Sequence, residues 1–404
     1  MSEVEGGKLR SIRARALVLD AERSIDDGAV IVDGEAIVAV GPAAGLWDTV
    51  SPTDRIDLGD VVLAPGLIDA HAHLELSALE GCSERGAKFE RWVGDLLASR
   101  VATPESTLLG ARDRVAGDLL DSGTTIVGDI DSLGLDPLVA PGPERLVYRE
   151  LLDARDPKRT EGEMEKIVRA VEESGPEWIG LSPHAPFSVS DALLASIAEK
   201  ASRLPRAMHW AETEEEVRWF DGDPGWFDRF FPRDSTMHGL DALERHGLLD
   251  ARTALVHGNH PRPGEPERIA RAGATVVHCP GSHAYFDRAP FPLDLYRDAG
   301  VTLALGTDSA ASNDGVDMRR EMARFLDTQP GVSPAEVWRA ATAGGAAALG
   351  LKGRVGVIER GFRADFAAFR CAAPAGAALL EQLVAGIPAV ESVWLRGRCV
   401  RHRA

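Results

Sequence analysis

The segment GLIDAHAHLE places two histidines, His71 and His73, one residue apart directly after an apolar run. If the run is a β-strand, side chains two residues apart share one face, so both imidazoles point the same way. Neutral imidazole is a common ligand of zinc and related metals. The pair therefore predicts half of a metal site, although H-x-H alone is a weak motif because most single histidines bind no ion.

The same pattern recurs along the chain, where other residues able to bind metal or move protons also follow short apolar runs. They are His184, His209, Glu212, His257, His278 and Asp308. In a (β/α)8 barrel, the carboxyl ends of the strands form the functional face. Burying several imidazoles and a carboxylate without an ion or a partner is costly. These placements predict that the side chains meet at one site.

Closure of a barrel would bring His209 and Asp308 beside His71 and His73. Three imidazoles and one carboxylate, with room left for water, have the composition of an open catalytic metal site. An alternative for Asp308, in the segment ALGTDS, is that it caps a helix. Metal ligation is favoured because it supplies the anionic ligand that three histidines lack.

The elements that must position these residues alternate along the middle of the chain. From about residue 64, short apolar runs alternate with stretches of helical periodicity, which is typical of a parallel sheet. Eight runs are predicted as strands: GLIDAHA, TTIVGDI, RLVYREL, EWIGLSPH, RAMHWAE, TALVHG, ATVVHCP and VTLALGTDS. The expected fold class is therefore α/β, a (β/α)8 TIM barrel.

Both ends of the chain are predicted to be β-rich. Residues 9–62 contain alternating runs and an Asp-Gly pair at 33–34, which is a strong hairpin signal, and the runs after residue 350 are β-like again. We expect the two ends to pair into one small β-sandwich. The predicted parts are residues 1–62 and 351–404 for the sandwich and 63–350 for the metal-dependent barrel.

The composition excludes several partners. The chain has 404 residues and a formal net charge of -18, which disfavours nucleic acid and anionic membrane surfaces. No apolar run approaches the ~20 residues of a membrane span, and the start lacks a signal-peptide core. The four cysteines show no C-x-x-C spacing, so reduced thiols are expected. We expect a cytoplasmic protein that acts on a small molecule, and a homodimer stays open.

Six segments, in this order, resemble the amidohydrolase superfamily: PGLIDAHAHLE, SPHAPFSVS, HWAETEEE, VHGNH, HCPGS and LGTDSAASN. The likeness covers nearly the whole chain and points to the branch of mononuclear-metal aminohydrolases that deaminate purine and pyrimidine rings. The resemblance implies a hydrolase of C–N bonds in cyclic amidines. It also implies one divalent metal on His71, His73, His209 and Asp308, with zinc favoured and iron as the alternative.

A single metal is expected because relatives with two metals usually carry a bridging lysine on the fourth strand, and EWIGLSPH has none. Glu150, at the end of the third run, could bridge a second ion or could be an ion-paired structural carboxylate. The structural role is favoured.

The resemblance also implies a division of labour. A bound divalent metal lowers the pKa of water from 15.7 to about 7. Asp308 would ligate the metal and accept the water's proton, and His257 would orient the attacking group and stabilise its charge. Glu212 would protonate the ring nitrogen and pass a proton to the departing ammonia. The alternative for Glu212 is a solvated charge in the acidic run ETEEE, as expected for Glu214, Glu215 and Glu216.

Substrate contacts are expected at three residues. His184 matches a position that contacts substrate in nucleoside-type relatives, and Glu75 and Trp92 would contact the part of the substrate outside the purine. The alternatives are support of the metal ligands for His184 and Glu75 and helix packing for Trp92. His278 and His283 stay open between substrate binding and a structural role, although the structural role is favoured.

Within the branch, the segments HAHLELSAL, FERWVGDLLASR and SPHAPFSVS are most similar to the aminofutalosine deaminases. These enzymes convert 6-amino-6-deoxyfutalosine to futalosine and ammonia on a route to menaquinone. Deaminases of S-adenosylhomocysteine, methylthioadenosine or adenosine stay open, as do guanine and cytosine deaminases and chlorohydrolases. A scaffold of the same fold without activity is the alternative from another class, and the retained metal ligands argue against it.

Overall fold

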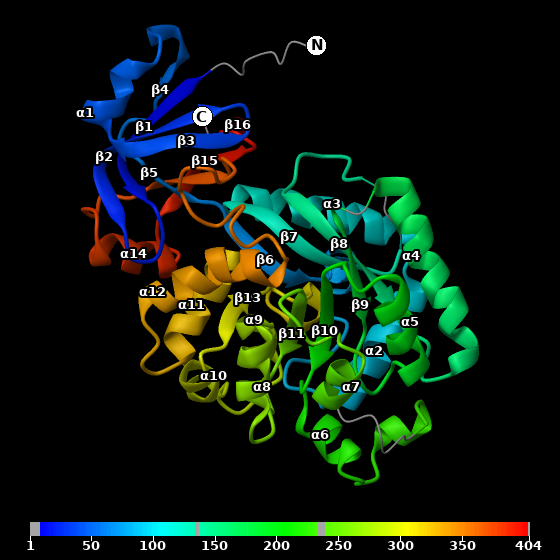
Figure 1. The fold of residues 1–404 in the computed structure, drawn as a ribbon. Helices are drawn as coiled ribbons and strands as arrows, with labels where there is room; N and C mark the ends of the chain where they lie inside the picture. The colour runs from blue at the N-terminus through cyan, green and yellow to red at the C-terminus, as the bar shows by residue number, and fades with distance from the viewer. Residues whose placement is uncertain (1–8, 134–136, 176, 233–238, 403–404) are drawn as a thin grey trace.

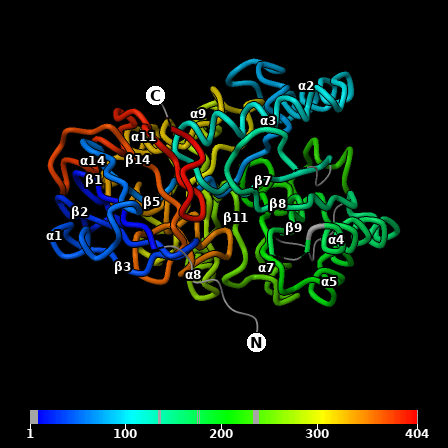
Figure 2. Tube along the Cα trace, turned by 90° about the horizontal axis from the view of Figure 1, so that it is seen from above, coloured from blue at the N-terminus to red at the C-terminus, as the bar shows by residue number. Residues whose placement is uncertain are grey.

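A computed structural model describes residues 9–133, 137–175, 177–232 and 239–402. It contains a parallel barrel and, beside it, a mixed sheet built from both ends of the chain (Figures 1 and 2). No helix within these ranges has the length and the apolar character that crossing a bilayer requires. The four cysteines are free thiols.

Eight parallel strands form the barrel and are neighbours in the order in which they occur in the chain. They are β6 (Leu67–Ala72), β7 (Thr124–Asp131), β8 (Glu144–Leu151), β9 (Ile179–Pro183), β10 (Arg206–Trp210), β11 (Thr253–His257), β12 (Thr275–His278) and β13 (Thr302–Leu305). Six of them lie within the predicted runs, and β7 and β8 each extend one residue beyond theirs. Strands such as β7 are buried along their whole length, because helices cover the outside of the barrel and side chains fill its interior. The predicted barrel is confirmed.

The first and last strands close the barrel at the residues expected to bind metal. Ala72 and Asp308 form a parallel bridge. The His73 amide donates to the Asp308 carbonyl at 3.0 Å, and the Asp308 amide donates to the His71 carbonyl at 3.0 Å. Closure of the barrel and assembly of the site therefore depend on the same backbone contacts.

The buried carboxyl group of Asp69, on β6, also supports the closure of the barrel. Thr307 Oγ1 donates to Asp69 Oδ2 at 2.6 Å, and the Thr307 amide donates to Asp69 Oδ1 at 3.1 Å. Burial raises the pKa of Asp69 to about 7, although these hydrogen bonds oppose the rise. The pair joins the segment that follows β13 to β6.

The helices of the barrel connect its strands and cover its outer face (Figure 1). They are α2 (Phe89–Ala102), α3 (Glu105–Asp121), α4 (Thr160–Ser174), α5 (Asp191–Lys200), α6 (Glu214–Phe220), α7 (Gly239–Arg245), α8 (Glu265–Ala272), α9 (Pro280–Tyr285), α10 (Leu293–Ala299), α11 (Met318–Thr328), α12 (Pro334–Arg339) and α13 (Gly345–Ala348). Short turns of helix follow two of the strands, η3 (Leu74–Leu79) after β6 and η6 (Ala310–Ser312) after β13, and another, η5 (Trp226–Arg229), follows α6. Capping residues define several starts. Ser190, for example, accepts the Leu193 amide at the start of α5.

The terminal sheet has the order β16-β15-β14-β5-β1-β2-β3, with β4 paired to β1. Its strands are β1 (Arg10–Val18), β2 (Ser24–Asp33), β3 (Ala36–Pro42), β4 (Arg55–Asp57), β5 (Val62–Pro65), β14 (Phe366–Arg370), β15 (Ala389–Leu395) and β16 (Arg398–His402). Helices α1 (Ala43–Leu46) and α14 (Ala377–Val384) accompany it. The predicted hairpin joins β2 to β3, with Gly34 at a φ of 58° in its turn.

Antiparallel pairing of β14 with β5 joins the two ends of the chain. Val30 and Ile37 from one side of the sheet share an apolar cluster with Phe366 and Trp394 from the other side, so the sheet bends around a core of its own. The expected β domain built from both termini is confirmed. The limits 1–62, 63–350 and 351–404 stay a prediction.

Candidate active site

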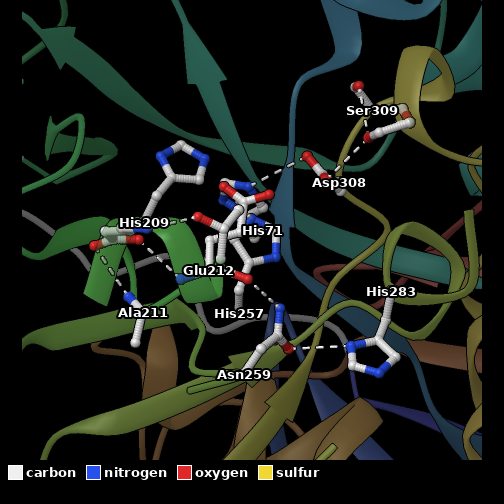
Figure 3. A network of polar contacts seen from close by, with 12 residues as sticks. His71, His209, Ala211, Glu212, His257, Asn259, His283, Asp308 and Ser309 are labelled. Atoms are coloured by element: carbon white, nitrogen blue, oxygen red, sulfur yellow. Dashed lines mark hydrogen bonds and ion pairs between the residues drawn. The ribbon is translucent and has the colours of Figure 1, made fainter. Parts of the chain in front are cut away.

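The four residues predicted as metal ligands come together at the carboxyl ends of the barrel strands. Figure 3 shows three of them, His71, His209 and Asp308. His71 lies near the end of β6, His73 directly after it, His209 on β10, and Asp308 after β13. The Nε2 atoms of His73 and His209 are 3.3 Å apart. Asp308 Oδ1 lies 3.7 Å from His71 Nε2 and 3.8 Å from His73 Nε2. His257, at the end of β11, adds a further imidazole.

This ligand cluster, defined as His71, His73, His209 and Asp308, is suited to a cation. Neither nitrogen of the buried His71 ring has a hydrogen-bond partner among the described residues. His209 Nδ1 donates to the His184 carbonyl at 2.9 Å, which leaves the lone pair of its Nε2 free. Burial, with the neighbouring His71, lowers the pKa of His73 to about 3 and that of His209 well below its ordinary value. Neutral imidazoles oriented in this way could hold a metal ion.

Asp308 supplies the negative charge. Burial alone would raise its pKa, but the adjacent imidazoles of His71, His257 and His73 outweigh burial and hold the pKa well below its usual range. Ser312 Oγ donates to Asp308 Oδ2 at 3.0 Å and orients the carboxylate. The Asp308 backbone has a φ of 58°, a left-handed conformation that non-glycine residues seldom adopt and that clusters at functional sites.

Two more residues around the site share this conformation. His257 has a φ of 74°, and Ala211, between His209 and Glu212, has a φ of 49°. Each lies where a strand ends, so the backbone turns sharply there and presents the neighbouring side chains to the centre of the barrel mouth. Such strain persists only when the surrounding packing and hydrogen bonds determine it.

Glu212 is buried beside the ligand cluster, so the alternative of a solvated charge is wrong. Its Oε1 accepts a hydrogen bond from Arg288 Nη2 at 2.8 Å, and its Oε2 lies 3.8 Å from His257 Nε2. Burial raises the pKa of Glu212 to about 7 while Arg288 opposes the rise. A carboxyl group with a pKa near neutrality can both donate and accept a proton at physiological pH.

The acidic run after Glu212 divides into two kinds. Glu214 and Glu215 are exposed, as expected. The expectation for Glu216 is wrong, because this residue is buried and its carboxylate accepts the amides of Ala211 at 3.3 Å and Glu212 at 2.9 Å. The pattern T-x-x-E, in which Thr213 caps the helix, is the signal that could have identified it.

A cavity of about 470 Å³ opens from the ligand cluster toward α2 and η5. The predicted substrate contacts His184, Glu75 and Trp92 all line it, as does Glu150. Most of the other lining side chains are apolar or aromatic, including Phe89, Leu96, Phe187, Trp226, Phe230 and Phe231. An apolar cavity with a few converging polar groups is the usual form of a small-molecule site.

The polar groups of these lining residues have different surroundings. His184 Nδ1 lies 2.7 Å from Ser188 Oγ, and Ser132 Oγ donates to Glu75. Burial raises the pKa of Glu75 to about 7. Trp92 Nε1 donates to the Ala311 carbonyl at 2.9 Å, so its ring supplies an apolar surface to the cavity.

His278 and His283 are not among the described residues that line the cavity. His283 Nδ1 is 3.1 Å from Asn259 Oδ1, and its Nε2 is 2.7 Å from the Ala289 carbonyl. Asn259 in turn donates to the Glu212 carbonyl at 3.0 Å. His278 is buried, with its ring 4.0 Å from that of Phe291. Both histidines pack around the site, as the favoured structural role predicts.

Sequence reasoning missed Arg288. This residue follows α9 and has no neighbours in a recognisable motif, and its guanidinium lies over the Phe286 ring at 4.8 Å. Nothing in the sequence marks it as the partner of Glu212. Glu150 belongs to neither of the two potential metal-binding groups found among the described residues.

Known proteins resemble this chain over most of its length. A 5-methylthioadenosine/S-adenosylhomocysteine deaminase of Halobacterium salinarum is 30% identical over 386 residues, covering 89% of this chain and 84% of its own. An aminodeoxyfutalosine deaminase of Deinococcus radiodurans is 30% identical over 363 residues, covering 83% and 84%. A crystal structure of an adenosine deaminase from Xanthomonas campestris with bound zinc is 26% identical, with a TM-score of 0.78 over 96% of this chain and 92% of that chain.

The barrel and its site together define an enzyme whose strand ends can hold a metal ion beside a substrate cavity. The sequence model of the amidohydrolase family matches residues 62–400. The chain belongs to the amidohydrolase family and is a hydrolase that acts on C–N bonds.

Proposed function

We propose that this chain is a metal-dependent deaminase of an adenine-containing nucleoside. The preferred substrate in this proposal is 6-amino-6-deoxyfutalosine, which is converted to futalosine and ammonia on a route to menaquinone. The observation that carries the proposal is the buried Glu212, which lies between Arg288 and His257 and lines a cavity together with His73, His209 and Asp308. Hydrolysis of an amidine carbon needs such a proton donor and acceptor beside the water that attacks.

In this proposal His71, His73, His209 and Asp308 would hold one divalent ion, zinc rather than iron, and this ion would supply an activated water near neutral pH. Asp308 accepts a proton as the attack begins. Glu212 protonates the ring nitrogen next to the reacting carbon and later delivers a proton to the leaving ammonia. His257, 3.8 Å from Glu212, orients the attacking group and stabilises the charge that develops there.

The cavity walls support a nucleoside. Its volume of about 470 Å³ lies within the range of small-molecule sites, and its aromatic side chains suit a planar ring. His184 lies where it can contact the purine, with its ring 5.0 Å from that of His209. Glu75 and the Trp92 ring line the same cavity, and in this proposal they contact the rest of the substrate. We further propose that the enzyme acts in the cytoplasm.

A second candidate is a deaminase of S-adenosylhomocysteine or methylthioadenosine. The Halobacterium salinarum relative carries that name and is as similar to this chain, at 30% identity, as the Deinococcus radiodurans relative. The two candidates share the reaction at the purine and differ only in the group attached to the ribose. The wall of the cavity away from the ligand cluster therefore decides between them.

An ammonia-release assay tests the proposal. Purified protein, with its metal content measured, is incubated with 6-amino-6-deoxyfutalosine, S-adenosylhomocysteine, methylthioadenosine, adenosine, guanine and cytosine, and the ultraviolet shift of adenine deamination is followed. We expect about one equivalent of zinc or iron and the highest kcat/KM for 6-amino-6-deoxyfutalosine. Activity confined to guanine or cytosine would refute a nucleoside deaminase, and a gently prepared protein without metal or activity would support the scaffold.

A further inference from the structure

Helix α2 lies along the substrate cavity and presents one face to it. The residues of this helix that line the cavity are Phe89, Trp92, Val93, Leu96, Leu97 and Arg100. Their spacing of three and four residues is that of a single helical face, which extends over about 16 Å at 1.5 Å per residue. This face is apolar for about two turns, from Phe89 to Leu97, and ends in the cation Arg100.

Arg100 is the single lysine or arginine among the described residues that line the cavity. Four carboxylates line it as well: Glu75, Glu150, Glu212 and Asp308. The whole chain has a formal net charge of -18, so an anionic ligand would be repelled from most of its surface. A permanent cation inside this cavity is therefore the feature that would admit an anionic group.

Arg100 makes no ion pair and no side-chain hydrogen bond within the described part of the chain. The other arginine of α2 behaves differently. Arg91 is 61% exposed and pairs with Glu84 at 3.5 Å and Asp95 at 3.7 Å. Arg100 is partly buried, and its charge opposes the rise in the pKa of Glu75, whose carboxyl group accepts a hydrogen bond from the Ser132 hydroxyl. The guanidinium donors of Arg100 are thus available to a ligand.

We propose that Arg100 binds a terminal carboxylate on the 5′ substituent of the nucleoside, and that it selects substrates carrying this group. The inference rests on the proposed function, since it assigns the part of the cavity that the purine does not occupy. The planar guanidinium matches a carboxylate through two parallel hydrogen bonds. The apolar face before it, with Phe89, Trp92 and Leu96, suits an aryl or alkyl group between the ribose and the carboxylate.

The surroundings of Arg100 also indicate which anion it takes. A phosphate carries up to two negative charges and would lie near Glu75 and Glu150 with a single cation to balance it. A monoanionic carboxylate therefore fits better than a nucleotide phosphate.

Paired substrates test this inference. For the wild type, we expect kcat/KM to be about 10- to 100-fold higher for 6-amino-6-deoxyfutalosine than for its methyl ester, which lacks the charge. Arg100→Met keeps the apolar stem and should abolish this difference, mainly through KM. Arg100→Lys keeps the charge but loses the two parallel donors of the guanidinium, so it should retain part of the preference for the free acid. Arg91→Met, on the exposed face of the same helix, is the matched control and should leave it intact.

Methylthioadenosine is an adenine nucleoside without a carboxylate. It therefore tests the deaminase activity separately from the role of Arg100. Its deamination should be the same in the wild type and in Arg100→Met. If the wild type deaminates methylthioadenosine but Arg100→Met still prefers the free acid to the ester, the assignment of Arg100 is wrong and the deaminase stands. A preference for 5′-adenosine monophosphate over the carboxylate would also overturn it.

Direct binding provides a readout that needs no turnover. Isothermal titration calorimetry with futalosine, the deaminated carboxylate, should show a Kd about 10- to 100-fold lower for the wild type than for Arg100→Met. Equal affinities would refute the carboxylate site, whatever the enzyme deaminates. If a metal-loaded preparation released ammonia from none of the nucleosides, the proposed function itself would be refuted.

Discussion

Arg288 Nη2 lies 2.8 Å from Glu212 Oε1, and both side chains are only 10% exposed. Arg288 also donates to the Glu212 carbonyl, so it holds this residue by both side chain and backbone. A buried carboxyl group that lacked this partner would be strongly biased toward its neutral form. The ion pair therefore determines both where the Glu212 carboxyl points and how readily it gives up a proton.

Replacement of Arg288 should shift the pH dependence of the reaction. Burial raises the pKa of Glu212 to about 7 and Arg288 opposes the rise, so Arg288→Met should move this pKa upward. The limb of the kcat/KM profile that reports Glu212 should then move to higher pH. Arg218→Met, which breaks the exposed pair with Glu214, should leave the profile in place. An unshifted kcat/KM profile in Arg288→Met would show that this arginine does not influence the pKa of Glu212.

Glu212→Gln should retain the metal and lose turnover. The amide preserves the size of the side chain but cannot transfer a proton, and positioned general acid–base groups contribute about 10²- to 10⁴-fold to rate. Elemental analysis checks the metal content, and ammonia release checks kcat. Glu215→Gln, three residues along and exposed, is the control and should behave as the wild type. Normal turnover in Glu212→Gln would remove this residue from the mechanism.

Loss of one member of the ligand cluster should release the metal. His73→Ala removes an imidazole whose Nε2 lies 3.3 Å from His209 Nε2. Metal content should fall, and a chelator should no longer lower the melting temperature, because a ligand at 100 times its Kd contributes about 2.7 kcal/mol to stability. His246→Ala, which breaks a pair with Asp191 at 2.8 Å, is the control and should keep the metal. Full metal occupancy in His73→Ala would exclude His73 as a ligand.

Buried histidine should also make the metal-free protein sensitive to acid. Burial, with His283 and His257 nearby, lowers the pKa of His278 well below its ordinary value. As pH falls below about 6.5, the unfolded chain binds a proton at this residue and the folded protein does not, so stability is lost by up to about 1.4 kcal/mol per pH unit. The free energy of unfolding can be measured with urea between pH 7 and 5. It should change less steeply with pH in His278→Leu than in the wild type.

The neighbour of His278 supplies the control for this slope. Phe291 stacks on its ring at 4.0 Å, so Phe291→Leu should lower stability at every pH without changing the slope. The same slope in His278→Leu and the wild type would show that the buried imidazole takes up its proton in the folded state.

The contact that closes the barrel should be important for stability. Thr307→Val removes the hydroxyl that donates to Asp69 at 2.6 Å and leaves a buried carboxyl group with one partner fewer. Loss of a buried hydrogen bond of this kind costs about 1–3 kcal/mol. Thermal unfolding should show the decrease. Thr302→Val, at an exposed position of β13, should cause almost none, and equal melting temperatures would contradict the role given to Thr307.

Sequence patterns predicted the parts of the fold and site that depend on regular spacing. The eight apolar runs have the length and burial of barrel strands, and residues at their carboxyl ends must face the same mouth. His71, His73, His209 and Asp308 could therefore be grouped without knowing any distance. Glu216 was predicted wrongly as a solvated charge, although T-x-x-E at a helix start is a regular pattern that predicts a carboxylate turned back to the backbone.

Other parts depend on how loops fold back, and spacing does not predict this. Arg288 reaches Glu212 across 76 positions of sequence from a loop after α9. The cavity surface of α2 has no strictly buried residue, so its amphipathic pattern is weak and Arg100 looks like any exposed arginine. The positions of Arg288 and Arg100 both depend on tertiary packing. The residues next to a single arginine in the sequence do not indicate which carboxylate it will contact.

The pairing of β14 with β5 affects the order in which the molecule can form during translation. Strand β5 precedes the barrel and β14 follows it, so one edge of β5 has no partner until the ribosome has passed the last barrel strand. An unpaired strand edge attracts other chains. A nascent chain stalled after the barrel would therefore expose this edge, and aggregation or chaperone capture is the expected fate of such truncated products.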